Sequence, residues 1–96
     1  PYTVHLEKHL VYCGSESISL TVKEYDLLLY LAANRGHVLK RGDILDAVWG
    51  YTFYGSDRVV DDTIRRLRKK LPGIEISTLY GLGYCLTEER HESLCD

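Results

Sequence analysis

Positive charge is concentrated in one short segment, RVVDDTIRRLRKKL, at residues 58–71. This segment holds six basic side chains and two aspartates, although the whole chain has a formal net charge of -2. Arginine can donate two hydrogen bonds to the edge of a guanine, and lysine can neutralise a phosphate. The segment could therefore bind a polyanion. A charged helix face that is merely solvated explains the charge alone equally well.

The spacing of apolar residues predicts how these side chains are presented. Four of them recur at helical intervals: Val60, Ile64, Leu67 and Leu71. This pattern predicts a helix over residues 57–71 with one buried stripe. The opposite face would present six polar side chains: Arg58, Asp62, Thr63, Arg65, Arg66 and Lys69. A threonine on that face could touch the methyl group of a thymine.

Asp62 needs a separate interpretation, because phosphates repel a carboxylate. The favoured interpretation is a helical ion pair with Arg66, four residues later, in the first turns where the helix dipole favours an anion. The alternative is that Asp62 accepts a hydrogen bond from a cytosine amino group.

No other set of reactive side chains emerges from the sequence. The histidines and cysteines lack the spacing of a zinc site: His5, His9, His37, His91, Cys13, Cys85 and Cys95. Cys13 and Cys85 are predicted to be small buried hydrophobic side chains. The carboxylates suggest no acid–base pair, and GLGY at residues 81–84 lacks the third glycine of a dinucleotide-binding fingerprint. We therefore expect no enzyme activity, no metal and no cofactor.

The segments around the basic helix predict an α+β domain. Short runs at residues 2–20 predict an antiparallel sheet. Thr21 and Glu24 form a capping-box pattern before a helix that is expected to end at Gly36. A second helix is expected over residues 40–49. Two strands within residues 74–87 predict a hairpin, and the tail at residues 88–96 is expected to fray.

Length and composition fit one domain covering residues 1–96. A hydrophobic content of 45% is ordinary for a globular protein, and no apolar run is long enough to span a membrane. Three cysteines are too few for a disulfide scaffold, so we expect a reducing cytoplasm. Because the chain begins with Pro1 rather than Met, we expect it to be a fragment of a longer protein.

The sequence resembles the OmpR/PhoB-type effector domains of bacterial response regulators in four stretches. These are LTVKEYDLLLYLAANRGHVLKR (20–41), LDAVWG (45–50), DRVVDDTIRRLRKKL (57–71) and GLGYCL (81–86). The resemblance implies a winged helix-turn-helix: an N-terminal antiparallel sheet (1–20), a three-helix core (21–71) and a C-terminal β-hairpin wing (74–87). It also implies sequence-specific binding to double-stranded promoter DNA, a receiver domain in the full-length protein, and homodimers on paired half-sites.

The resemblance assigns expected roles to individual residues. Arg58 and Asp61 would brace the start of the recognition helix as a pair. The cationic run would contact bases and phosphates: Arg65, Arg66, Arg68 and Lys69. In the wing, Thr78 would bind a phosphate, and Tyr84 matches the tyrosine of the closing Gly-Tyr.

The chain departs from the family pattern at three positions. Tyr80 and Cys85 stand where the family often has arginine, and Asp62 stands at an apolar position. DNA binding is therefore expected to depend on the helix more than usual, with Tyr80 left to contact a phosphate or a sugar.

Aromatic residues gather around the loop at residues 50–57. Trp49 is interpreted as part of the core. For Tyr51, Phe53 and Tyr54, packing and a surface role remain equally open. The resemblance implies that this loop contacts RNA polymerase in several family members.

The sequence is therefore compatible with two functions. The first is a DNA-binding domain of a transcription regulator, in which Arg65, Arg66 and Thr63 read bases, with Asp62 as a further candidate. The backbone contacts would come from Arg68, Lys69, Thr78 and Tyr80. The alternative is a winged-helix protein-interaction module, favoured by the net negative charge and the wing's lack of cations. Salt dependence on duplex DNA separates the two functions, because only polyanion binding releases condensed counterions.

Overall fold

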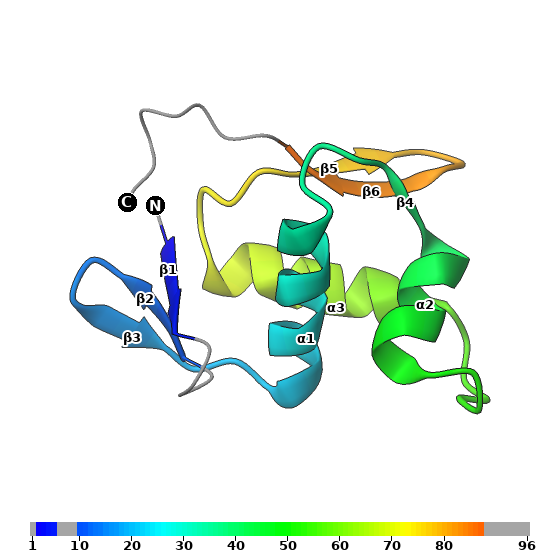
Figure 1. The fold of residues 1–96 in the computed structure, drawn as a ribbon, viewed down its shortest axis with the longest axis horizontal. Helices are drawn as coiled ribbons and strands as arrows, with labels where there is room; N and C mark the ends of the chain where they lie inside the picture. Colours follow the sequence, from blue (N-terminus) through cyan, green and yellow to red (C-terminus); the bar gives the residue numbers. More distant parts are fainter. Residues whose placement is uncertain (1, 6–9, 88–96) are drawn as a thin grey trace.

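The computed structural model describes residues 2–5 and 10–87 of the chain. The elements follow in the order β1 (Tyr2–His5), β2 (Leu10–Cys13), β3 (Glu16–Ile18), α1 (Val22–Ala33), β4 (Leu39–Lys40), α2 (Arg41–Trp49), α3 (Arg58–Lys70), β5 (Ile76–Leu79) and β6 (Gly83–Leu86). The first sheet lies at one end of the molecule and α2 at the other, with α1 and α3 between them (Figure 1). The α+β class and the predicted order of elements are confirmed. The predicted fraying of the tail at residues 88–96 lies outside the described residues.

α1 begins at the predicted capping box. The Thr21 hydroxyl accepts a hydrogen bond from the Glu24 backbone N–H at 3.2 Å, and Glu24 Oε1 accepts one from the Thr21 N–H at 2.9 Å. The helix ends at Ala33 with Asn34 as its C-cap, earlier than the predicted end at Gly36. Its inward face fully buries Leu27 and Leu31.

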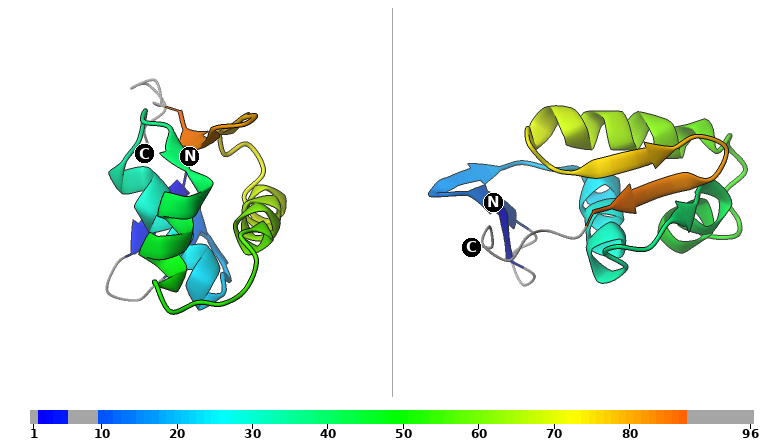
Figure 2. Two further views of the ribbon diagram at one scale, coloured as in Figure 1. Left: turned by 90° about the vertical axis from the view of Figure 1, so that its right-hand side faces the viewer. Right: turned by 90° about the horizontal axis from the view of Figure 1, so that it is seen from above.

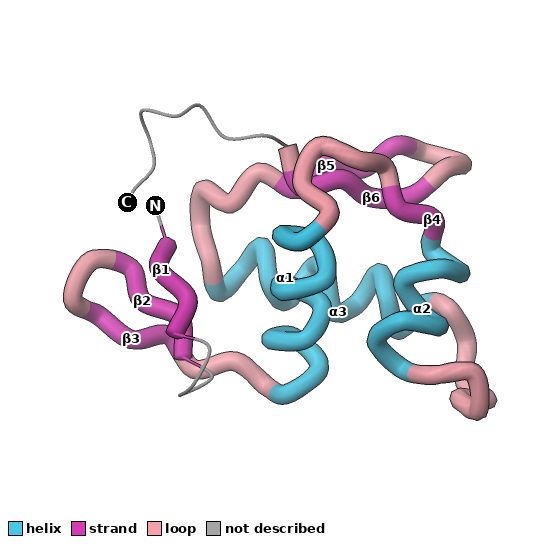
Figure 3. Tube along the Cα trace, viewed as in Figure 1, coloured by secondary structure: helices cyan, strands magenta, loops and turns pink. Residues whose placement is uncertain are grey.

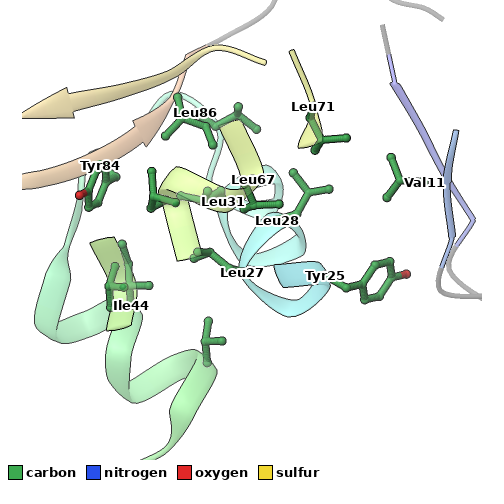
Figure 4. Packing of buried hydrophobic residues seen from close by; sticks show 14 residues of the cluster. Val11, Tyr25, Leu27, Leu28, Leu31, Ile44, Leu67, Leu71, Tyr84 and Leu86 are labelled. Carbon is green, nitrogen blue, oxygen red and sulfur yellow. The ribbon is translucent and has the colours of Figure 1, made fainter. Parts of the chain in front are cut away.

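α3 buries the stripe that its sequence predicts. All four side chains of the stripe are at most 1% exposed: Val60, Ile64, Leu67 and Leu71. Leu67 lies among the leucines of α1 (Figure 4). The helix ends at Lys70, because Pro72 disfavours helical backbone at the residue before it. Burial of this stripe fixes which face of α3 solvent can reach.

The predicted burial of the two strand cysteines holds for only one of them. Cys85 in β6 is 8% exposed, as expected of a core residue. Cys13 is exposed, so that prediction was wrong. Val11 in the middle of β2 is fully buried, whereas Cys13 ends the strand directly before the turn at Gly14, where solvent reaches it.

The wing contains one strand that the sequence did not predict. The hairpin of β5 and β6 is present, but β4 pairs with β6, so the sheet order is β4-β6-β5. β4 has only two residues and leads directly into α2 (Figure 3). The hairpin runs along the length of α3 (Figure 2). Within the described ranges, no helix is long and apolar enough to cross a membrane.

Candidate nucleic-acid interface

The exposed face of α3 is basic. Its 13 residues span about 20 Å, and five charged side chains that face solvent lie opposite the buried stripe: Arg58, Asp62, Arg65, Arg66 and Lys69. Their predicted placement on the outer face is confirmed. Arginines and lysines held in this way present hydrogen-bond donors and positive charge along one side of a rigid rod.

Thr63 does not belong to this face, and its predicted placement was wrong. The residue is 1% exposed, and its hydroxyl donates a hydrogen bond to the Val59 carbonyl oxygen at 2.7 Å. Thr63 comes three residues after Val60 and four before Leu67, so helical periodicity turns it toward the stripe. A thymine methyl group cannot reach it.

Arg68 is exposed, but its guanidinium is hydrogen-bonded within the protein. Its Nη2 donates to the Ile76 carbonyl oxygen at 2.6 Å and to the Thr78 hydroxyl at 2.8 Å. Its guanidinium also lies 5.9 Å from the centre of the Tyr84 ring, within cation–π range. Arg68 and Thr78, both expected to hold the DNA backbone, therefore bond to each other and connect α3 to β5.

Asp61 is paired, but not with Arg58 as predicted. It accepts hydrogen bonds from Arg41 Nε at 3.1 Å and Nη2 at 2.8 Å, and Arg41 Nη2 also reaches Asp57 at 3.1 Å. At the start of the helix, the Arg58 backbone N–H donates a hydrogen bond to the Ser56 hydroxyl at 3.1 Å. Arg41 was missed because 20 residues separate it from Asp61, and no local pattern links positions so far apart.

Tyr84 completes this cluster from β6. Its hydroxyl donates to Asp61 Oδ1 at 2.6 Å. Burial, and then the hydrogen bond to Asp61, raise the pKa of Tyr84 to about 12, against the smaller opposing influence of Arg68 and Arg41. The hydrogen bond to Asp61 likewise raises the pKa of Arg41. Tyr84 is therefore a protonated donor and Arg41 a fixed cation at neutral pH.

Asp62 forms an ion pair, but with a different partner from the predicted Arg66. Its carboxylate lies 3.6 Å from Arg65 Nη2, three residues later, and both side chains are more than half exposed. An exposed pair of this kind contributes little stability. Arg65 therefore remains able to turn toward a ligand.

Lys70 is the second α3 cation that is used internally. Its ammonium lies 2.7 Å from Oε1 of Glu24, a residue of α1 that is fully buried. Burial alone would raise the pKa of Glu24, but hydrogen bonds from Lys70 and the Thr21 backbone outweigh burial and lower it below 4.5. Glu24 is therefore a buried carboxylate whose negative charge is stabilised by Lys70.

The wing tip is apolar and exposed. Tyr80 is 92% exposed and Leu82 is 58% exposed, on either side of Gly81, whose φ of 82° suits a tight turn. Between the tip and the start of α2 lies an open pocket of about 540 Å³, lined in part by Lys40 and Arg41. The tip thus offers hydrophobic surface and no cation of its own.

The loop between α2 and α3 divides its aromatic residues between packing and solvent. Tyr51 is 88% exposed and Tyr54 is 97% exposed. Phe53 is half-buried, with its ring centre 6.4 Å from that of Trp49, which packs against the core as predicted. Among the described residues no group of three potential ligands could hold a metal ion.

Three helices, an exposed basic third helix and a hairpin packed along it define a winged helix-turn-helix domain. The chain belongs to the family described as "Transcriptional regulatory protein, C terminal", whose family model matches residues 14–86. This match confirms the resemblance to OmpR/PhoB-type domains.

Known proteins of similar sequence and structure support the same family. The chain is 54% identical over 67 residues to the transcriptional regulatory protein CssR of Bacillus subtilis, covering 70% of this chain and 30% of that protein. It is 53% identical over 74 residues to VxrB of Vibrio cholerae, covering 77% and 30% respectively. The chain thus spans about 30% of the length of these curated relatives.

Two solved structures share the fold closely. The crystal structure of the DNA-binding domain of Bacillus subtilis CssR has a TM-score of 0.86 at 46% identity, covering 90% of this chain and 99% of that one. The DNA-binding domain of Klebsiella pneumoniae RstA, solved in complex with the RstA box, has a TM-score of 0.79 at 33% identity, covering 90% of both chains.

Proposed function

We propose that this domain binds double-stranded DNA in a sequence-specific manner through α3 and thereby regulates transcription. The exposed face of α3 carries the proposal, since it sets four basic side chains opposite a buried stripe. A helix of this width fits the major groove of B-DNA. The complex of the RstA domain with the RstA box supports DNA as the ligand.

The exposed side chains of α3 divide into two kinds of contact. Arg65 and Arg66 read guanines in the major groove, since arginine can donate two hydrogen bonds to this base. Arg58 and Lys69 neutralise phosphates at the two ends of the helix. Asp62 pairs with Arg65 in the free domain. On DNA, it accepts a hydrogen bond from a cytosine amino group where the DNA site has a cytosine in reach.

The wing contributes beside the helix. Tyr80 at its tip contacts a sugar or donates a hydrogen bond to a phosphate, because an exposed phenol carries no charge with which to form an ion pair. Thr78 is already bound to Arg68, so its hydroxyl reaches a phosphate only while keeping that contact. This arrangement gives the wing a small share of the electrostatic attraction.

The wider setting of the domain is also proposed from its relatives. The domain forms part of a longer cytoplasmic response regulator that carries a receiver domain and binds paired half-sites as a homodimer. Tyr51 and Tyr54 present an aromatic surface to RNA polymerase, and Phe53 anchors their loop against Trp49. The near-complete exposure of both tyrosines supports this division.

Selection from a random library of duplex DNA tests the proposed function. Enrichment of one short motif is expected, with affinity that falls steeply as salt rises. Arg65→Ala and Arg66→Ala should each cost about 1–3 kcal/mol and relax specificity at one base pair. Arg35→Ala, at an exposed position after α1, is the control for loss of a charge alone. Weak binding without enrichment, both for the single domain and for an artificially dimerised one, would refute the proposal and favour the protein-interaction alternative.

A further inference from the structure

The wing is attached to the recognition helix at two points. Toward the start of α3, Asp61 accepts the hydrogen bond from Tyr84 of β6 at 2.6 Å. Toward its end, Arg68 donates to the Ile76 carbonyl and the Thr78 hydroxyl of β5. Seven residues separate the two attachments, which is about 10 Å along the helix axis and close to two full turns. Two attachments on one flank of α3 oppose rotation of the hairpin as well as its displacement.

A third connection runs through the start of α2. β4 pairs with β6 so that Lys40 lies opposite Gly83, and the next residue, Arg41, opens α2. A Cβ atom at Gly83 would collide with the Leu39 carbonyl oxygen, so the two strands approach closely. Arg41 then binds both carboxylate oxygens of Asp61. The start of α2, α3 and strand β6 therefore form a closed ring of contacts.

The two attachments also meet at one side chain. Tyr84 donates to Asp61 through its hydroxyl and carries the Arg68 guanidinium over its ring at 5.9 Å. Arg68 thus faces the wing with its Nη2 committed to a carbonyl and a hydroxyl. Two outward cations of α3, Arg66 and Lys69, make no ion pair within the described part of the chain.

We propose that five residues fix the orientation of the wing relative to the recognition helix: Arg41, Asp61, Arg68, Thr78 and Tyr84, together called the wing clamp. The inference rests on the proposed function, because the orientation determines where the wing meets DNA relative to the bases that α3 reads. Arg68 and Tyr84 are positioning residues, and neither contacts a phosphate. Fixing the wing in the free domain removes an ordering cost from binding.

Tyr84→Phe and Arg68→Met test the clamp on DNA, with Arg35→Met as the control. We expect each clamp variant to weaken binding to the selected half-site by about tenfold. Hydroxyl-radical footprints should lose protection on the wing side, while the slope of log affinity against log salt stays unchanged. The control should retain the full footprint. A fall of about 0.9 in that slope for Arg68→Met would identify a direct phosphate contact and overturn the positioning role.

Two further measurements make the result decisive. Arg68→Lys keeps the charge but lacks the guanidinium fork, so it should not restore the footprint; full rescue would overturn the proposal. In the DNA-free domain, NMR relaxation should show larger motion of β5 and β6 amides in both clamp variants, with α3 unchanged. Wing amides as ordered as α3 in both variants would also overturn it. Thr78→Val replaces Arg68→Met if that variant does not fold.

Failure of the clamp and failure of the proposed function give different results. If the parent domain binds no DNA, the proposed function fails, and the relaxation data still decide whether the clamp holds the wing. If the parent domain binds its motif and both clamp variants keep its affinity and footprint, the clamp is wrong and the proposed function stands.

Discussion

Replacing Lys70 with methionine would break the ion pair that joins α3 to α1. The Glu24 carboxylate would stay buried in the folded domain with the Thr21 backbone as its one remaining donor. Glu24 Oε2 already has no hydrogen-bond partner among the described residues. Methionine fills nearly the same volume as the lysine stem, so the change removes charge rather than packing.

The cost follows from two independent considerations. Removing one partner of a buried pair typically costs 3–5 kcal/mol, and the low end applies here because the Lys70 side chain is 36% exposed. The folded variant can instead protonate Glu24. At pH 7, about 2.5 pH units above the ordinary value of 4.5, this costs about 3 kcal/mol. We therefore expect a loss near 3 kcal/mol, or a fall in Tm of roughly 12–24 °C.

Urea denaturation at several pH values measures this loss. In the parent domain the lowered pKa of Glu24 contributes stability above pH 4.5 that disappears as the pH falls through the folded-state pKa. In Lys70→Met, burial raises the pKa of Glu24, so protonation at low pH relieves the unpaired charge. The difference in unfolding free energy between parent and variant should therefore shrink from pH 7 toward pH 4.

Two further variants separate the buried charge of Glu24 from the loss of a lysine in general. Lys69→Met removes the neighbouring exposed lysine and should change stability by no more than about 0.5 kcal/mol. Glu24→Gln combined with Lys70→Met removes the buried charge and should be more stable than Lys70→Met alone at pH 7. A loss below about 1 kcal/mol for Lys70→Met at both pH 7 and pH 5 would refute the reasoning, because an unpaired buried carboxylate could not be so well tolerated.

Three further results are expected from the remaining features. In DNA titrations, Lys69→Met should reduce the slope of log affinity against log salt by about 0.9. Lys70→Met should leave the slope unchanged, because the Lys70 ammonium is paired with Glu24 in the parent domain. Equal changes in the two variants would contradict this division. Because folding raises the pKa of Tyr84 from 10 to about 12, its protonated hydroxyl stabilises the folded domain below pH 10, and this stability is lost as the pH rises through 12. In alkaline denaturation the unfolding free energy of the parent should therefore fall by about 2–3 kcal/mol more than that of Tyr84→Phe. Replacing Tyr51 and Tyr54 with alanine should leave DNA affinity unchanged and lower polymerase-dependent transcription in a reconstituted assay; unchanged transcription would exclude the loop as a polymerase contact.

Elements coded by local patterns could be predicted from the sequence. The capping box at Thr21 needs two residues three apart, and the buried stripe of α3 repeats at the helical period. The outward placement of Arg65 and Lys69 followed from that stripe. Thr63 could have been placed correctly by the same periodicity, and the error came from giving it a groove-facing role.

Contacts between distant segments could not be predicted. β4 is too short to show alternation, and its pairing with β6 joins residues more than 40 apart in the chain. The Arg41–Asp61 and Lys70–Glu24 pairs depend on how helices cross, which no single segment encodes. Sequence patterns therefore located the basic face of α3 but not which of its cations are available to a ligand.

The division of charge on α3 limits what one copy of the domain can gain from electrostatics. With Arg68 and Lys70 engaged internally, four cations remain for phosphates and bases. Two of them, Arg58 and Lys69, neutralise phosphates and give a slope of about -1.8, so raising salt from 50 to 200 mM weakens binding by about 12-fold. Because the rest of the chain is acidic, tight binding requires base contacts and a second copy on a neighbouring half-site. An artificially dimerised domain on paired half-sites should therefore show a slope near -3.6, and a slope still near -1.8 would argue against simultaneous binding of both copies.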